Sequence, residues 1–146
     1  MRKIAILLAA ALLGAGPAAP CSSASAMCSC VPPPSVPRAL GEADAVFQGR
    51  VIDVRTGRED LRVRIRVARR WKGAGGDTVT VRTARGSPSC GFDFVAGTEY
   101  LVYARRARAP ETALAVSLCS RTKRAEDARR EIRTLHRLAG YRGMQR

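Results

Sequence analysis

The sequence predicts a mainly β domain: a barrel of five short strands, with a short helix before the strands, a longer helix after them, and two disulfide bonds. Segments of alternating apolar and polar residues recur along the chain with turn residues between them. An even number of cysteines also remains once an export signal is removed. Five strands in series with short connections are typical of a small closed or partly open barrel.

The first 26 residues have the pattern of a secretory signal peptide. Arg2 and Lys3 form a basic start, residues 4–13 form an apolar run, and Ala24-Ser25-Ala26 offers the small residues that signal peptidase reads. The apolar run is too short to remain in a bilayer as a transmembrane helix. A retained N-terminal anchor and a lipoprotein signal ending at Cys21 are the alternatives.

We therefore expect a mature chain that begins at or near Met27 and is secreted, to the extracellular space or the periplasm. It would form one domain over 27–140, followed by a basic tail over 141–146. No later stretch is apolar enough to predict a membrane span. We expect a monomer.

The elements follow from local patterns. Proline keeps the segment 31–37 extended, and Gly49 indicates a bend or bulge within the first strand. The expected elements are a short helix over 38–44 and strands over 45–55, 61–67, 78–83, 100–104 and 113–118.

The clearest alternation lies in the strand expected over 61–67. Its apolar residues should cover a core, whereas Arg62, Arg64 and Arg66 should point toward water.

A helix is expected near the C-terminus, because apolar residues recur at helical spacing from Ala125 to Leu138. Ser120 or Thr122 is placed to cap its start, Gly140 to end it, and Glu126 to pair with Arg130 one turn away. His136, beside the apolar stripe, is interpreted as a partly buried packing residue.

Four cysteines remain after the signal: Cys28, Cys30, Cys90 and Cys119. A bridge between the first two would close a very small strained ring, so each should pair with one of the distant two, in an order that the residues alone do not fix. A four-cysteine zinc site is the alternative, but the spacing lacks paired C-x2-C knuckles.

The chain is strongly basic, with a net charge of +14, and only three of its 26 basic residues are lysine. Arginine suits phosphate, sulfate and carboxylate partners, so polyanion binding through an arginine-rich surface is one interpretation and a plain solvated surface is the other. Aromatic residues make up only 5% of the chain, which argues against specific recognition of nucleic acid by base stacking. No catalytic constellation or phosphate loop is present in the sequence, so we expect neither an enzyme nor a bound cofactor.

Several segments together resemble a known family. Cys28-Ser29-Cys30-Val31-Pro32-Pro33, followed by Ala43-Asp44-Ala45-Val46-Phe47, is similar to the opening of the tissue inhibitors of metalloproteinases. Trp71-Lys72-Gly73, Ser89-Cys90-Gly91, residues 97–102 and Leu118-Cys119-Ser120 continue a netrin-like pattern over nearly all of the mature chain. The resemblance implies an OB-fold barrel. It also implies the pairing of Cys28 with Cys90 and of Cys30 with Cys119.

The chain departs from that family in three ways. Leu40 stands where the family has a third N-terminal cysteine, and its late partner is also missing. We expect no C-terminal domain. The predicted signal cleavage leaves Met27 ahead of Cys28.

The resemblance implies a secreted metalloendopeptidase inhibitor. The α-amine and carbonyl of Cys28 would chelate the catalytic zinc of a target protease, and Ser29 would enter its specificity pocket. Cys30, Val31 and Pro32 would continue like product residues, and Pro88 and Ser89 would complete the wedge. The alternative is a non-inhibitory netrin-like module that binds polyanions or an extracellular protein.

Overall fold

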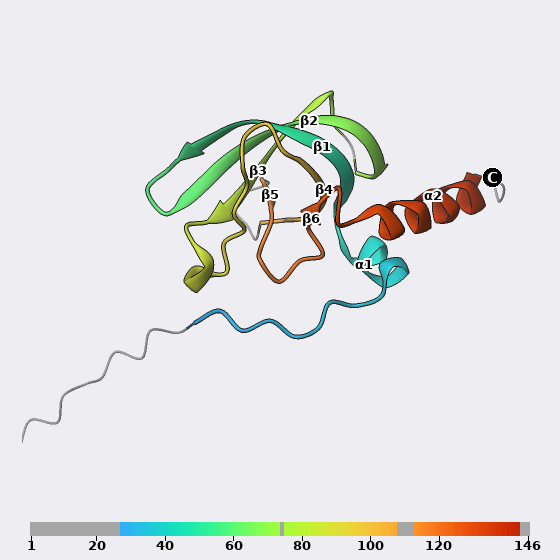
Figure 1. Ribbon diagram of the computed structural model, residues 1–146, viewed down its shortest axis with the longest axis horizontal. Coiled ribbons are helices and arrows are strands. Elements are labelled where there is room, and N and C mark those ends of the chain that lie inside the picture. Colours follow the sequence, from blue (N-terminus) through green and yellow to red (C-terminus); the bar gives the residue numbers. More distant parts are fainter. Residues whose placement is uncertain (1–26, 74, 108–112, 144–146) are drawn as a thin grey trace, which may run out of the picture.

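The computed structural model describes residues 27–73, 75–107 and 113–143 (Figure 1). The expected signal peptide over 1–26 lies outside the described residues. The elements, in order, are α1 (Val36–Glu42), β1 (Ala45–Thr56), β2 (Asp60–Lys72), β3 (Thr78–Ala84), the 3-10 turn η1 (Ser87–Ser89), β4 (Glu99–Arg106), β5 (Leu114–Ala115), β6 (Lys123–Arg124) and α2 (Arg129–Gly143). The prediction of a mainly β domain with a helix near each end is confirmed.

The described strands form one six-stranded sheet rather than the five strands expected. Its order is β1-β2-β3-β5-β4-β6, and β1 also pairs with β4, so the strand pairing returns to the first strand. The β3–β5 pairing is parallel and the others are antiparallel. In the register of the long strands, Ile65 of β2 lies opposite Val51 of β1 and Val79 of β3.

Two apolar clusters form the core, and they lie on opposite faces of β1 and β4. Phe47 and Val102 belong to the cluster enclosed by the strands. Val46 and Leu101, their neighbours in sequence, belong to the cluster covered by α1 and α2. Successive residues of a strand point to opposite faces, which explains why these strands carry consecutive apolar residues instead of an alternation.

The bulge expected near Gly49 is present. The register between β1 and β2 shifts between Gln48 and Gly49. A Cβ atom at Gly49 would lie 2.5 Å from the carbonyl oxygen of Arg66, closer than packing allows. Only glycine lets the two backbones approach this closely.

Several expected boundaries were wrong. The first helix spans Val36–Glu42 rather than 38–44, and its first turn contains proline, which is favoured at a helix start because its missing N–H has no partner there anyway. β2 continues well past residue 67 to Lys72 because its last residues pair with β1. Only Leu114–Ala115 of the strand expected over 113–118 pairs with neighbours. β6, which was not expected, pairs with β4.

The C-terminal helix also differs from its prediction. α2 begins at Arg129, because the residues before it form turns and the backbone N–H of Ala125 donates to the carbonyl of Glu99. Glu126 therefore precedes the helix and lies 3.7 Å from Arg124 instead of pairing with Arg130. The helix continues through Gly140 to Gly143, so the prediction that Gly140 ends it was wrong.

The expected cap residues have other roles. Thr122 is buried and its hydroxyl accepts a hydrogen bond from the Tyr103 backbone N–H at 3.0 Å, while the Ser120 hydroxyl accepts one from the Thr122 backbone at 3.2 Å. His136 is exposed rather than partly buried, although its ring packs edge-on against Trp71 at 5.3 Å between centroids.

Candidate functional site

The segment 27–35, ahead of α1, belongs to no helix or strand and runs along the lower side of the molecule in Figure 1. It is extended because it carries consecutive prolines, which fix φ and cannot donate to a sheet. Most of its side chains are exposed, Met27 to 82% and Val31 to 81%. The predicted contact residues Ser29, Val31 and Pro32 therefore lie on the surface.

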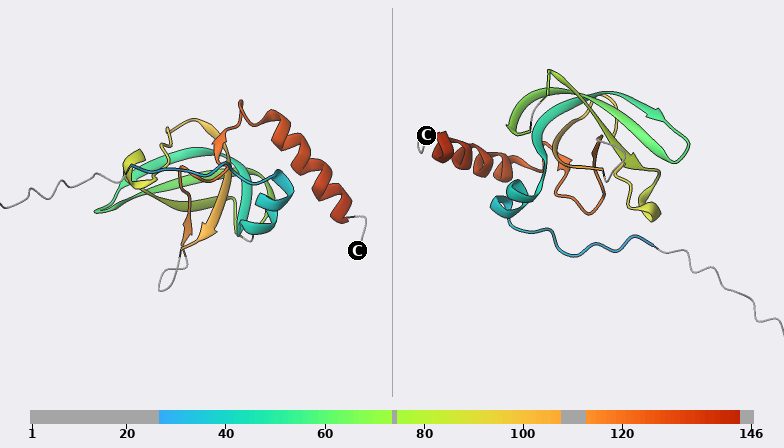
Figure 2. Two further views of the ribbon diagram at one scale, coloured as in Figure 1. Left: turned by 90° about the horizontal axis from the view of Figure 1, so that it is seen from below. Right: turned by 180° about the vertical axis from the view of Figure 1, so that it is seen from behind.

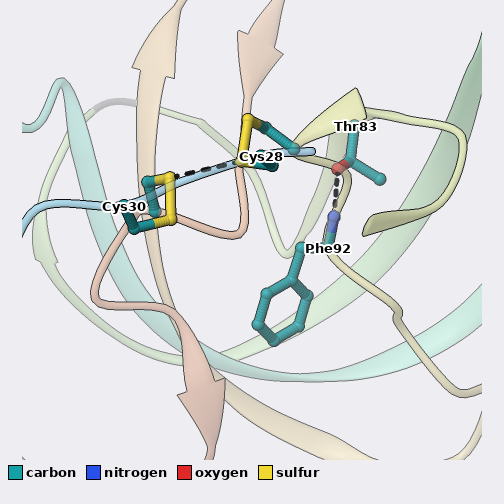
Figure 3. The surroundings of a disulfide bond; sticks show 6 residues. Cys28, Cys30, Thr83 and Phe92 are labelled. Atoms are coloured by element: carbon teal, nitrogen blue, oxygen red, sulfur yellow. Dashed lines mark hydrogen bonds between the residues drawn. A yellow bond between two sulfur atoms is a disulfide. The ribbon is translucent and has the colours of Figure 1, made fainter. Parts of the chain in front are cut away.

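Two disulfide bonds attach this segment to the rest of the domain (Figure 3). Cys28 bonds to Cys90, with Cα atoms 5.1 Å apart, and Cys30 bonds to Cys119, with Cα atoms 5.2 Å apart. The disulfides predicted from the cysteine count are confirmed, in the pairing that the resemblance implies.

The two bridges are in direct contact. The sulfur of Cys28 lies 3.6 Å from the sulfur of Cys119, and the sulfurs of Cys28, Cys30 and Cys119 all lie within 4.8 Å of one another. Each of these sulfurs is in a disulfide and carries no proton, so the contact drawn in Figure 3 is packing between bridges rather than a hydrogen bond. Zinc binds thiolates, so the alternative of a four-cysteine zinc site does not hold in this oxidised structure.

Arg121 provides a further anchor, one that the sequence analysis missed. Its guanidinium donates to the carbonyl of Pro34 at 2.6 Å and, through two other nitrogens, to both carboxylate oxygens of Glu131 at 2.7 and 2.9 Å. Lys123 approaches the same carboxylate at 3.0 Å. Arg121 thereby links the end of the N-terminal segment to the first turn of α2.

Glu131 is buried, with 7% of the residue exposed, and its carboxylate remains charged because of its partners. Burial raises the pKa of Glu131, but hydrogen bonds from Arg121 and Lys123 outweigh burial and hold the pKa below its usual value. The hydrogen bond to Glu131 raises the pKa of Arg121 against the opposing effect of burial. Burial, with the nearby charge of Glu131, raises the pKa of Tyr103, so the phenol stays protonated.

A cavity of about 460 Å³ lies beside the N-terminal segment, and its lining includes Val31, Pro34, Tyr103 and Val116. The segment therefore forms part of the wall of this pocket. Two bridges and the bond from Arg121 to Pro34 attach the segment to the domain.

The turn η1 presents the other predicted contact residues, Pro88 and Ser89, both exposed. It begins after Gly86 (φ 75°) and ends at Cys90, whose φ of 61° is left-handed. That conformation costs a non-glycine residue about 1 kcal/mol. It is held by hydrogen bonds from the Cys90 N–H to Ser87 at 3.0 Å and from the Leu118 N–H to Cys90 at 2.8 Å.

The structure brings the two predicted parts of the site to one end of the molecule. Pro88 and Ser89 immediately precede the cysteine that is bonded to Cys28. The adjoining strand is fixed to this loop as well, because the Phe92 backbone N–H donates to the Thr83 hydroxyl at 2.8 Å (Figure 3). The result is a short, mostly exposed segment beside an exposed turn, with a disulfide joining the two.

No protein-family model matches the chain, and a comparison with curated proteins gives no match. Among the helices of the described ranges, none is long and apolar enough to cross a bilayer.

Proposed function

We propose that this protein is an inhibitor of zinc metalloendopeptidases, secreted to the extracellular space or the periplasm, that acts through the segment beginning at Cys28. The observation that carries the proposal is the segment from Cys28 to Pro32, which two adjacent disulfides hold beside the exposed residues Pro88 and Ser89. Cys28 is partly buried, and the four residues that follow it are exposed. The protein would have no catalytic activity of its own and would need no cofactor.

We further propose that the sheet is an OB-fold barrel of the netrin-like type. The support is the strand pairing, which runs from β1 through β2, β3, β5 and β4 and returns to β1. The helix after β6 and the two bridges to the N-terminal segment agree with the resemblance of the sequence to tissue inhibitors of metalloproteinases.

The chemistry is coordination by the chain terminus. A catalytic zinc keeps one position open for water or substrate. A neutral α-amine and the carbonyl of the same residue form a chelating pair, and an α-amine pKa of about 7.7–8.0 leaves part of the amine neutral at physiological pH. Cys28 would supply both atoms, and Ser29 would occupy the adjoining specificity pocket of the protease.

Covalent attachment favours tight binding. Docking a flexible chain end costs conformational entropy, and ordering the segment in advance reduces that cost. Here the backbone is fixed before the protease binds, by the disulfides of Cys28 and Cys30 and by the prolines that follow them. Arg121 fixes the far end of the segment at Pro34.

The mechanism requires that Cys28 be the first residue. When Met27 precedes it, the nitrogen of Cys28 is an amide whose lone pair is delocalised into the carbonyl, and the Met27 side chain would occupy the space over the metal. Met27 is 82% exposed, so an aminopeptidase can reach it.

The test compares three preparations with verified N-termini: one that begins at Cys28, one that begins at Met27, and one that begins at Cys28 with its amine acetylated. Each is titrated against a panel of zinc endopeptidases. We expect the free-amine form to inhibit at least one protease stoichiometrically and the other two forms to be much weaker. Equal potency of the three forms would discard chelation, and no inhibition by any form would favour the non-inhibitory binding module.

A further inference from the structure

The outer face of β2 carries a row of arginines that the proposed inhibitor does not use. Arg62, Arg64 and Arg66 are exposed, and they alternate with Val63 and Ile65, which are fully buried. The alternation predicted from the sequence is confirmed here. In an antiparallel strand, alternate residues recur about every 7 Å, so the row presents one guanidinium group after another along a line.

The neighbouring strands extend this row into a surface. Arg50 of β1 lies opposite Arg66, while Arg62 lies between Arg55 of β1 and Arg82 of β3. Residues directly opposite each other in neighbouring strands point to the same face. We call this surface the basic face, and its members are Arg50, Arg55, Arg62, Arg64, Arg66 and Arg82.

Carboxylates compensate only part of this charge. Asp53 pairs with Arg55 at 2.7 Å and Asp60 pairs with Arg82. Arg64 lies opposite Asp53 in the strand register, but the Asp53 carboxylate accepts its hydrogen bond from Arg55. Among the residues that the structure describes, Arg62, Arg64 and Arg66 form no ion pair. Because like charges directly opposite each other destabilise a sheet, the basic face repels itself unless an anion covers it.

We infer that the basic face binds a linear polyanion, an acidic polysaccharide that carries sulfate or carboxylate groups. Guanidinium groups bind both kinds of anion through paired hydrogen bonds. Thr78 and Thr80 of β3, both exposed, lie opposite Arg66 and Arg64 and add hydroxyl groups for the sugar. The aromatic residues of β1 and β2, Phe47 and Trp71, pack in the two apolar clusters instead of among these arginines. This disfavours single-stranded nucleic acid, since its bases need rings on which to stack.

The basic face and the proposed inhibitory segment are separate surfaces. Figure 1 and the right-hand view of Figure 2 both place the β1–β2 hairpin on the opposite side of the molecule from residues 27–35. A polysaccharide held on β2 therefore leaves residues 27–35 uncovered, and the inference does not depend on the proposed function.

The test measures binding of the exported protein to a sulfated dextran oligomer by titration calorimetry over a range of salt concentrations. A variant with Arg62→Gln, Arg64→Gln and Arg66→Gln is compared with a matched control that removes the same charge from α2, with Arg129→Gln, Arg130→Gln and Arg133→Gln, all exposed in the structure. We expect the β2 variant to lose about tenfold or more in affinity and the slope of log K against log salt to become shallower by about 2–3 units. The α2 variant should lose much less.

Folding is checked by thermal unfolding at low salt, where the β2 variant should be at least as stable as the wild type because repulsion is removed. A triple Arg→Lys variant at the same positions keeps the charge and should retain the salt dependence. An equal loss in the β2 and α2 variants would overturn the inference, since net charge alone would then explain binding. It would also be overturned by tighter binding to a single-stranded oligonucleotide of the same charge, by binding to anionic vesicles alone, or by no binding at low salt.

Discussion

Replacing Glu131 with glutamine removes one charge from the contact between the N-terminal segment and α2 while keeping the size of the side chain. The carboxylate side chain is 6% exposed, and its guanidinium partner on Arg121 is 17% exposed. Breaking a buried ion pair by neutralising one partner costs about 3–5 kcal/mol when both groups are fully buried. Because Arg121 is partly exposed and glutamine still offers an oxygen acceptor, we expect a loss of about 2–3 kcal/mol in the free energy of unfolding.

Urea denaturation of wild type and variant, followed by circular dichroism at pH 7, measures this loss. A matched control is Glu126→Gln, because Glu126 is 64% exposed and only 3.7 Å from Arg124. The control should change stability by no more than about 0.5 kcal/mol. If Glu131→Gln were as mild as the control, the Arg121–Glu131 pair would not stabilise the fold and the reasoning would be refuted.

The pH dependence gives a second readout. The folded pKa of Glu131 is lowered, so its contribution to stability is fully present above the unfolded value of about 4.3 and is lost as pH falls through the folded pKa. The difference between wild type and Glu131→Gln should therefore be constant near neutral pH and shrink once the pH falls below about 5. A difference that grew on acidification would contradict the assigned direction of the pKa.

Three further predictions concern other contacts. Serine at both Cys30 and Cys119, which are 89 residues apart, should lower the free energy of unfolding by up to about 4–5 kcal/mol in urea; a peptide mass map of non-reduced wild type should show that bridge, and free thiols there would contradict it. Gly49→Ala should cost about 1–3 kcal/mol, since its Cβ would meet the carbonyl of Arg66; an unchanged urea midpoint would exclude the close approach. Arg121→Lys should weaken inhibition of a sensitive zinc protease while the circular dichroism spectrum stays native, because lysine cannot join Pro34 and both oxygens of Glu131 at once; full potency would show that the Pro34 contact does not order the segment.

The sequence was most informative where local periodicity and burial agree. The alternation over 61–67 predicted the centre of β2 because one face of that strand packs on the core and the other meets water. It was least informative where tertiary contacts decide the structure. β6 contains only Lys123 and Arg124, which carry no apolar pattern, and it is a strand because the backbone of β4 is available beside it.

In the candidate site, too, residue types predicted the local features, whereas the tertiary contacts had no signal in the sequence. The extended segment and its cysteines were apparent from residue types, but the pairing came from a resemblance and not from spacing. The link from Arg121 to Pro34 and Glu131 had no local signal, because the three residues meet only after the strands and α2 have packed. Likewise, the helical spacing that begins at Ala125 does not produce a helix there. The residues before Arg129 form turns instead, and the Ala125 backbone N–H donates to the carbonyl of Glu99.

The position of β4 between two apolar clusters has a consequence for cooperativity. Leu101 and Tyr103 pack toward α1 and α2, whereas Tyr100 and Val102 pack toward the other strands. Detaching the helices would uncover one face of a strand whose other face is still buried, so the helices and the sheet cannot melt as independent units. We expect the amides of residues 101–103 to exchange with deuterium only when the whole molecule unfolds, and those near the end of α2 to exchange far sooner through local opening.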